Sequence, residues 1–131
     1  MGTWSIWLAH KRGGIDMKFI RGDTFPFKFQ VKRKDGTAII KDDIDVLFIT
    51  VKTSIYTDKV IFQKTLNDIE IDEEGDFHVV FSSKDTENLN YGKYIFDIEI
   101  TLKSGYRKTK LFEFELIGET TFHKDGGGEN A

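Results

Sequence analysis

The feature that most constrains this fold is the alternation of apolar and polar residues near the end of the chain. Every second residue from 94 to 102 is large and apolar, and the same alternation returns from 112 to 116. Successive side chains of a β-strand point to opposite faces of the sheet, so the pattern predicts two strands that each bury one face. Lys103–Tyr106 lies between them and contains Gly105, which suits a tight turn. We therefore expect a hairpin.

The same period of two predicts further strands earlier in the chain. Pro26 lacks an amide donor, so the start of its strand is expected at a sheet edge, whereas Val46 and Phe48 suggest a central strand that is buried on both faces. Residues 82–89 are the one plausible helix, of one or two turns. The predicted fold is an all-β, antiparallel two-sheet immunoglobulin-like β-sandwich with one short helical turn. The other expected strands lie around residues 25–31, 46–53, 59–66, 69–71 and 77–81.

Composition limits the classes of function. The 131 residues suffice for one hydrophobic core, to which 12 phenylalanines contribute. No cysteine is present, so disulfides and thiolate chemistry are excluded, and the Cys and Trp landmarks of antibody domains are missing. The formal net charge of −3 gives no reason to expect a nucleic-acid partner. No apolar run approaches the roughly 20 residues of a membrane span, so no membrane location is expected.

The chain is expected to divide into three parts. Residues 1–16 contain both tryptophans and a loop-like Gly-Gly pair, residues 17–122 carry the strand pattern, and residues 123–131 form a glycine-rich flexible tail. Two interpretations of the first part stay open. It is either an arm that docks its Trp and Ile side chains on a neighbouring protein, or an upstream extension of little consequence. Its apolar run and charge order do not match a secretory signal.

No catalytic, cofactor or metal site is predicted. His10, His78 and His123 are far apart and lack the spacing of zinc ligands, and His78 falls on the polar face of its strand. The acidic segment 72–76 lacks the alternating oxygen ligands of a calcium-binding loop, so we interpret it as a solvated turn. Arg21-Gly22-Asp23 is interpreted as a turn that caps a sheet edge. No phosphate loop and no nucleophile elbow is present, so an enzyme is not expected.

Two segments together resemble a known group of proteins. Met17–Phe27 contains Arg-Gly-Asp-Thr at the start of its predicted strand, and Tyr91–Thr101 with Phe112–Leu116 forms the closing hairpin. This pairing is similar to small virion proteins of tailed phages and prophages, including the immunoglobulin-like N-terminal domain of baseplate upper proteins. The resemblance covers most of residues 17–122 and implies a tail, baseplate or neck subunit in several copies. No fibre or lectin domain follows, which favours a connector, collar, tail or decoration role over receptor recognition.

We therefore expect a non-catalytic virion component, made in the bacterial host cytoplasm, that acts through protein–protein contacts. Its expected partners are other virion proteins and copies of itself in a homo-oligomer, without nucleic acid, membrane or cofactor. Two alternatives stay open: a carbohydrate-binding or adhesin-like sandwich that stacks sugars on Tyr56, Tyr91 and Tyr106, and a small hydrolase that needs His78 beside a carboxylate. The predicted partner-binding residues combine the aromatic arm with the Pro-marked strand: Trp4, Ile6, Trp7, Phe25 and Phe27.

Overall fold

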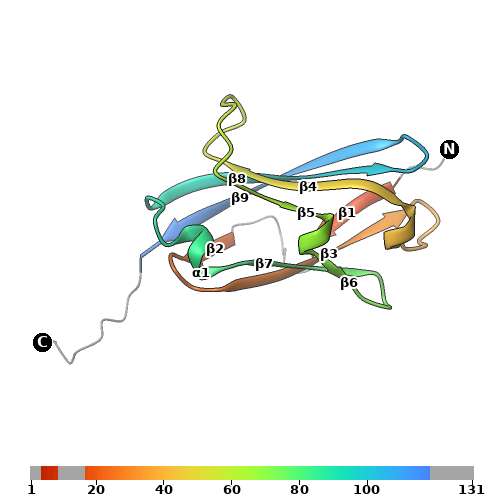
Figure 1. Cartoon of the computed structure of the whole chain (residues 1–131), viewed down its shortest axis with the longest axis horizontal. Coiled ribbons are helices and arrows are strands. Elements are labelled where there is room, and N and C mark those ends of the chain that lie inside the picture. The colour runs from red at the N-terminus through yellow and green to blue at the C-terminus, as the bar shows by residue number, and fades with distance from the viewer. Residues whose placement is uncertain (1–3, 9–16, 119–131) are drawn as a thin grey trace, which may run out of the picture.

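The computed structural model describes residues 4–8 and 17–118, which form two β-sheets packed face to face (Figure 1). A short helix, α1 (Ser83–Thr86), and two 3₁₀ turns (Lys41–Asp43 and Leu66–Asp68) connect strands of these sheets. In this part of the chain no helix is long and apolar enough to cross a membrane. The strands are β1 (Trp4–Leu8), β2 (Met17–Ile20), β3 (Phe25–Arg33), β4 (Ile44–Lys52), β5 (Phe62–Thr65), β6 (Glu70–Ile71), β7 (Asp76–Phe81), β8 (Gly92–Leu102) and β9 (Arg107–Ile117).

The strand order within each sheet is that of an immunoglobulin domain. One sheet has the order β1-β3-β7-β6 and the other the order β2-β9-β8-β4-β5. Immunoglobulin domains place strands A, B, E and D in one sheet and C, F and G in the other, and variable-type domains add strands beside C. Here β1, β3, β7 and β6 take the first set of positions, and β4, β8 and β9 the second, with β5 added beside β4. The predicted immunoglobulin-like sandwich is confirmed.

The first strands of the described chain contribute to both sheets. β1 pairs antiparallel with β3, so that Ile6 lies opposite Val31, and the Ile6 side chain is buried. β2 instead pairs parallel with β9, so that Met17 lies opposite Phe114. Strand pairing of the sandwich thus begins before residue 17, where the sequence analysis expects the domain to start. The predicted tail, residues 123–131, lies outside the described residues.

The strand that contains Pro26 is paired on both sides over only part of its length. β3 lies between β1 and β7, but β1 covers only Phe29–Arg33. Pro26 lies before that stretch and is opposite Val80 of β7. In the described structure Pro26 therefore has a paired strand on one side only. On its unpaired side a missing amide donor costs no ladder hydrogen bond. The start of β3 thus lies at an edge, as predicted, although the rest of the strand is in the interior of the sheet.

Phenylalanine rings connect the two sheets. Phe81 of β7 is fully buried, and its ring lies edge-on to those of Phe27, Phe62 and Phe96 at centroid distances of 5.1, 5.1 and 5.7 Å. Phe27 of β3 and Phe96 of β8 also contact each other directly, with centroids 5.5 Å apart. Such aromatic pairs contribute about 0.5–1.5 kcal/mol each beyond the burial of apolar area. The core is thus concentrated at one cluster of rings between the sheets.

Tyr94, near the start of β8, forms a known landmark of this fold. Its side chain is buried, its ring stacks on Phe114 at 5.5 Å, and its hydroxyl donates a hydrogen bond to the Asn90 carbonyl oxygen at 2.6 Å. A tyrosine in this place, bonded to the backbone a few residues upstream, is the tyrosine corner of immunoglobulin domains. In antibody domains the second cysteine follows two residues later, and here that position holds Phe96. The contact between Phe96 and Phe27 therefore stands in the place of the inter-sheet disulfide.

Candidate interaction surfaces

The structure separates the five residues that the sequence predicts as partner-binding. Ile6 and Phe27 are 1% and 3% exposed and belong to the core, so neither side chain is accessible to a partner in this conformation. Phe25 is partly buried, and its ring stacks on Phe19 with centroids 3.6 Å apart. The backbone of Trp4 and Trp7 lies in β1, whereas their side chains are outside the described part of the structure. A partner contact by the two tryptophans stays a prediction.

Three exposed apolar side chains cluster in the connection between β4 and β5, which projects beyond the body of the sandwich (Figure 1). Tyr56 is 90% exposed, Ile55 54% and Val60 45%. Within the projection, the N–H of Tyr56 donates to the Ser54 hydroxyl oxygen at 3.1 Å. Tyrosine is enriched among the residues that contribute most of the binding energy at protein interfaces. We call residues 53–61 the β4–β5 projection.

The outer face of the five-stranded sheet is apolar over part of its area. Val46 and Phe48 of β4 and Ile95 of β8 alternate with core residues and are half-buried on this face. Leu111 of β9 is 48% exposed. The outer face of the four-stranded sheet differs, because most of the alternate positions of β3 and β7 there are polar: Lys28, Gln30, Lys32, Asp76 and His78.

Asp97 indicates that the outer face of the five-stranded sheet is partly dehydrated. It lies on β8 between Thr50 of β4 and Leu111 of β9. Burial raises the pKa of Asp97 above its ordinary value, the nearby Glu99 raises it further, and Lys52 opposes the change. Dehydration disfavours the charged form of a carboxyl group. This face therefore already excludes some water before any partner binds.

The three tyrosines considered for sugar stacking do not form one platform. Tyr91 precedes β8 and Tyr106 follows it. The two tyrosines therefore lie near opposite ends of a strand of 11 residues, in which each residue adds about 3.3 Å of length. Tyr91 also packs against Arg21, whose guanidinium lies 4.1 Å from the ring centroid and donates to the tyrosine hydroxyl at 2.9 Å. The adjacent Gly22 N–H donates to Thr86 Oγ1 at 3.0 Å. Arg21-Gly22-Asp23 is thus a turn that ties β2 to the corner before β8.

One group of potential metal ligands comes together among residues 4–8 and 17–118, namely Asp72, Asp76 and His78. Their proximity is not expected from the sequence, because neither the acidic segment nor the histidine has ligand spacing by itself. They meet because Asp76 and His78 are two residues apart on one face of β7, and the β6–β7 turn returns Asp72 to the same place. The proximity of His78 to a carboxylate is also the condition that the hydrolase interpretation requires. His10 and His123 lie outside the described residues.

No protein-family model matches the chain, and the comparison with curated proteins gives no match. Solved structures with a similar fold include CopC from Methylosinus trichosporium OB3b, with a TM-score of 0.50 and 10% identity over 91% of this chain and 100% of that chain. MtrC from Shewanella baltica OS185 has a TM-score of 0.53 and 14% identity over 90% of this chain but 24% of its own. Murine CRIg has a TM-score of 0.48 and 8% identity over 91% of this chain and 100% of its own. At these identities the similarity concerns the fold alone.

Proposed function

We propose that the chain is a non-catalytic structural subunit of a phage or prophage particle, which acts through contacts with other virion proteins and with copies of itself. The phage assignment rests on the resemblance of residues 17–122 to small tailed-phage virion proteins. The contact role rests on one observation: the β4–β5 projection presents Ile55, Tyr56 and Val60 to solvent at the end of a rigid sandwich. These apolar groups replace the buried Ile6 and Phe27 as the contact residues of the proposal.

Physical considerations support the β4–β5 projection as a contact point. Removal of apolar surface from water contributes about 25 cal/mol per Å². The projection is anchored where it joins β5, because the Ile61 N–H donates to the Val51 carbonyl oxygen at 2.8 Å. An anchored loop loses less conformational entropy when a partner orders it. β4 also carries Phe48 on its outer face, so a partner that contacts the projection can extend its contact along the same sheet.

Self-association is tested by analytical ultracentrifugation of the full chain over a range of concentrations. We expect a discrete oligomer that dissociates when Ile55→Ser and Tyr56→Ser are combined. Val80→Ser is the control, because it also changes an exposed apolar side chain to serine but lies on the outer face of the other sheet. A wild-type chain that is monomeric throughout, or an oligomer that the double variant retains, would refute contact between copies through the projection.

The virion role is tested separately by mass spectrometry of purified particles. Particles are prepared from the strain that carries the gene, and peptides of this chain are quantified against those of the major capsid protein. We expect a fixed ratio that corresponds to several copies per particle. If the chain is absent from particles that form normally, the structural role in the virion is wrong, whatever its oligomeric state.

A further inference from the structure

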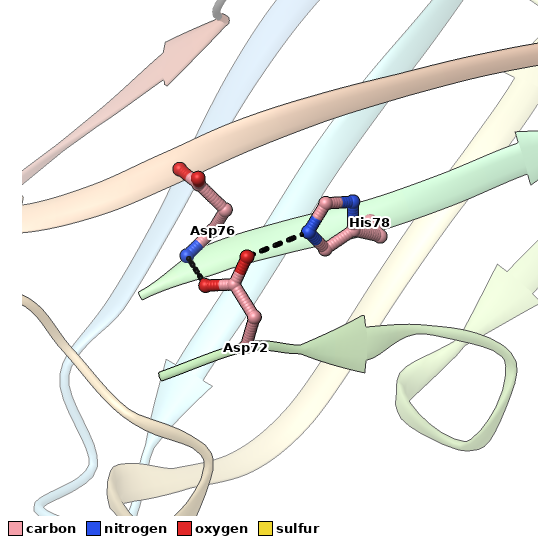
Figure 2. A group of neighbouring side chains, drawn as sticks. All are labelled: Asp72, Asp76 and His78. Carbon is pink, nitrogen blue, oxygen red and sulfur yellow. Dashed lines mark hydrogen bonds and ion pairs between the residues drawn. The ribbon is translucent and has the colours of Figure 1, made fainter. Parts of the chain in front are cut away.

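We propose that Asp72, Asp76 and His78 bind a divalent transition metal ion of the zinc class on the outer face of the four-stranded sheet. Figure 2 shows Asp72 at the β6–β7 turn beside Asp76 and His78 on β7. Each residue offers one ligand atom, and these atoms all lie within 4.8 Å of one another. This inference goes beyond the proposed contact role and depends on none of the residues that carry it.

The turn holds Asp72 in a fixed orientation. Asp72 Oδ1 accepts the backbone N–H groups of Glu74 and Asp76, both at 2.9 Å. The other oxygen, Oδ2, is thereby directed to His78 Nε2 at 2.8 Å (Figure 2). A charged ligand that is already oriented loses little entropy when it binds a metal ion.

The donor set selects the class of metal. One imidazole nitrogen with two carboxylate oxygens suits zinc and related transition metals, whereas calcium and magnesium prefer oxygen ligands alone. Zinc–ligand distances of about 2.0–2.2 Å place neighbouring tetrahedral ligands roughly 3.4 Å apart. The 2.8 Å between the atoms of Asp72 and His78, and the limit of 4.8 Å for the whole group, lie on either side of this value. To bind the ion, Asp72 and His78 would have to exchange their mutual hydrogen bond for bonds to the metal, with their ligand atoms moving apart by about 0.6 Å.

Two side chains of β3 act on Asp76 in opposite ways. Gln30 Nε2 donates to Asp76 Oδ1 at 2.7 Å, and a hydrogen bond of this kind orients a metal ligand. Lys28 Nζ lies 3.5 Å from Asp76 Oδ2 and competes with a metal ion for the same charge. The Lys28 side chain is 44% exposed, so it is free to move into solvent. A bound metal ion would thus replace one long, partly buried ion pair.

The site borders an open hollow of about 540 Å³ to which Asp72 and His78 both contribute. Glu70 and Lys41 also line this hollow, and Glu70 is the cross-strand partner of His78. A metal ion held by these residues would lie beside this hollow, where water could complete its coordination, as in zinc sites with three protein ligands.

The test is a titration of zinc chloride into the full chain by isothermal calorimetry, after removal of any polyhistidine tag. We expect one equivalent to bind, with a loss of affinity of more than about tenfold in His78→Gln and in Asp72→Asn, because even partners of metal ligands contribute about 10- to 100-fold. Asp72→Asn retains an oxygen acceptor for the turn N–H groups, so the turn is preserved. His123→Gln, a change of another histidine, is the matched control and should bind like the wild type.

Lys28→Ala is expected to change the zinc affinity in the opposite direction from His78→Gln and Asp72→Asn. Removal of the competing ammonium group should raise zinc affinity, an effect that a purely structural His–Asp pair does not produce. No binding by the wild type, undiminished binding by His78→Gln, or a loss of binding in His123→Gln would each overturn the assignment. Circular dichroism of every variant verifies that the fold is intact, and the Ile55→Ser, Tyr56→Ser variant should bind zinc normally because its changes lie elsewhere.

Discussion

Replacement of Tyr94 by phenylalanine removes one oxygen atom and leaves the ring in place. The ring would still stack on Phe114, at 5.5 Å, so the change isolates the hydrogen bond that the hydroxyl donates to the Asn90 carbonyl oxygen at 2.6 Å. That bond closes the corner between α1 and β8. A buried hydrogen bond contributes about 0.5–1.5 kcal/mol net, and an abandoned partner costs more where water cannot reach it. Asn90 is exposed, so water can replace the lost donor.

We therefore expect Tyr94→Phe to lower the free energy of unfolding by about 0.5–1.5 kcal/mol. For a chain of 131 residues this corresponds to a fall in Tm of about 2–5 °C. Differential scanning calorimetry measures the shift, and urea denaturation should show a lower midpoint with an unchanged m-value. An altered m-value would mean that the variant changes the compactness of the native or the denatured state, and not the hydrogen bond alone.

Tyr91→Phe is the matched control for this prediction. It removes the same atom from an exposed tyrosine, whose hydroxyl accepts a hydrogen bond from Arg21 at 2.9 Å. An exposed group of this kind should change the stability by less than about 0.5 kcal/mol. If Tyr94→Phe and Tyr91→Phe have the same Tm, the hydroxyl at the corner contributes nothing net, and the reasoning from the tyrosine corner is refuted.

Two further changes test the core and the outer face. Phe81→Ala should cost about 3–5 kcal/mol in urea denaturation, because Phe81 contacts rings of both sheets; a cost below about 1 kcal/mol would show that the cluster closes around the gap. Asp97→Asn should raise Tm at about pH 7 and have little effect near pH 3. The raised pKa of Asp97 means that its protonated form favours the folded state, so its contribution is present below the ordinary pKa and is lost as pH rises through the folded-state pKa. A lower Tm for Asp97→Asn at neutral pH would contradict this sign.

Strands β3 to β9 could be predicted from the sequence, because burial of one face imposes a period of two, whereas β1 and β2 were not expected. The hairpin of β8 and β9 follows directly from alternation on either side of Gly105. The neighbours of each strand could not be predicted in this way, since periodicity carries no information about distant segments. The pairing of β1 with β3 and of β2 with β9 depends on such distant contacts.

The exposure of the candidate contact residues could also be predicted from the strand pattern. Phe27 alternates with Lys28 in a strand that buries one face, so the pattern that predicts the strand also places Phe27 in the core. The prediction of Phe27 as a contact residue rests instead on its aromatic ring and on its position beside Pro26. Tyr56 breaks the strand period and lies between two predicted strands, and this position indicates exposure. Convergence of Asp72 with His78 requires the geometry of the β6–β7 turn, which residue spacing alone does not reveal.

The contact between Phe27 and Phe96 also has a consequence for where and how fast the domain can fold. The chain has no cysteine, so its two sheets are joined without a bond that a reductant can break. Folding does not wait for thiol oxidation, which takes seconds to hours. Added dithiothreitol should leave its unfolding curve unchanged. The core would therefore be the same in reducing and in oxidising surroundings.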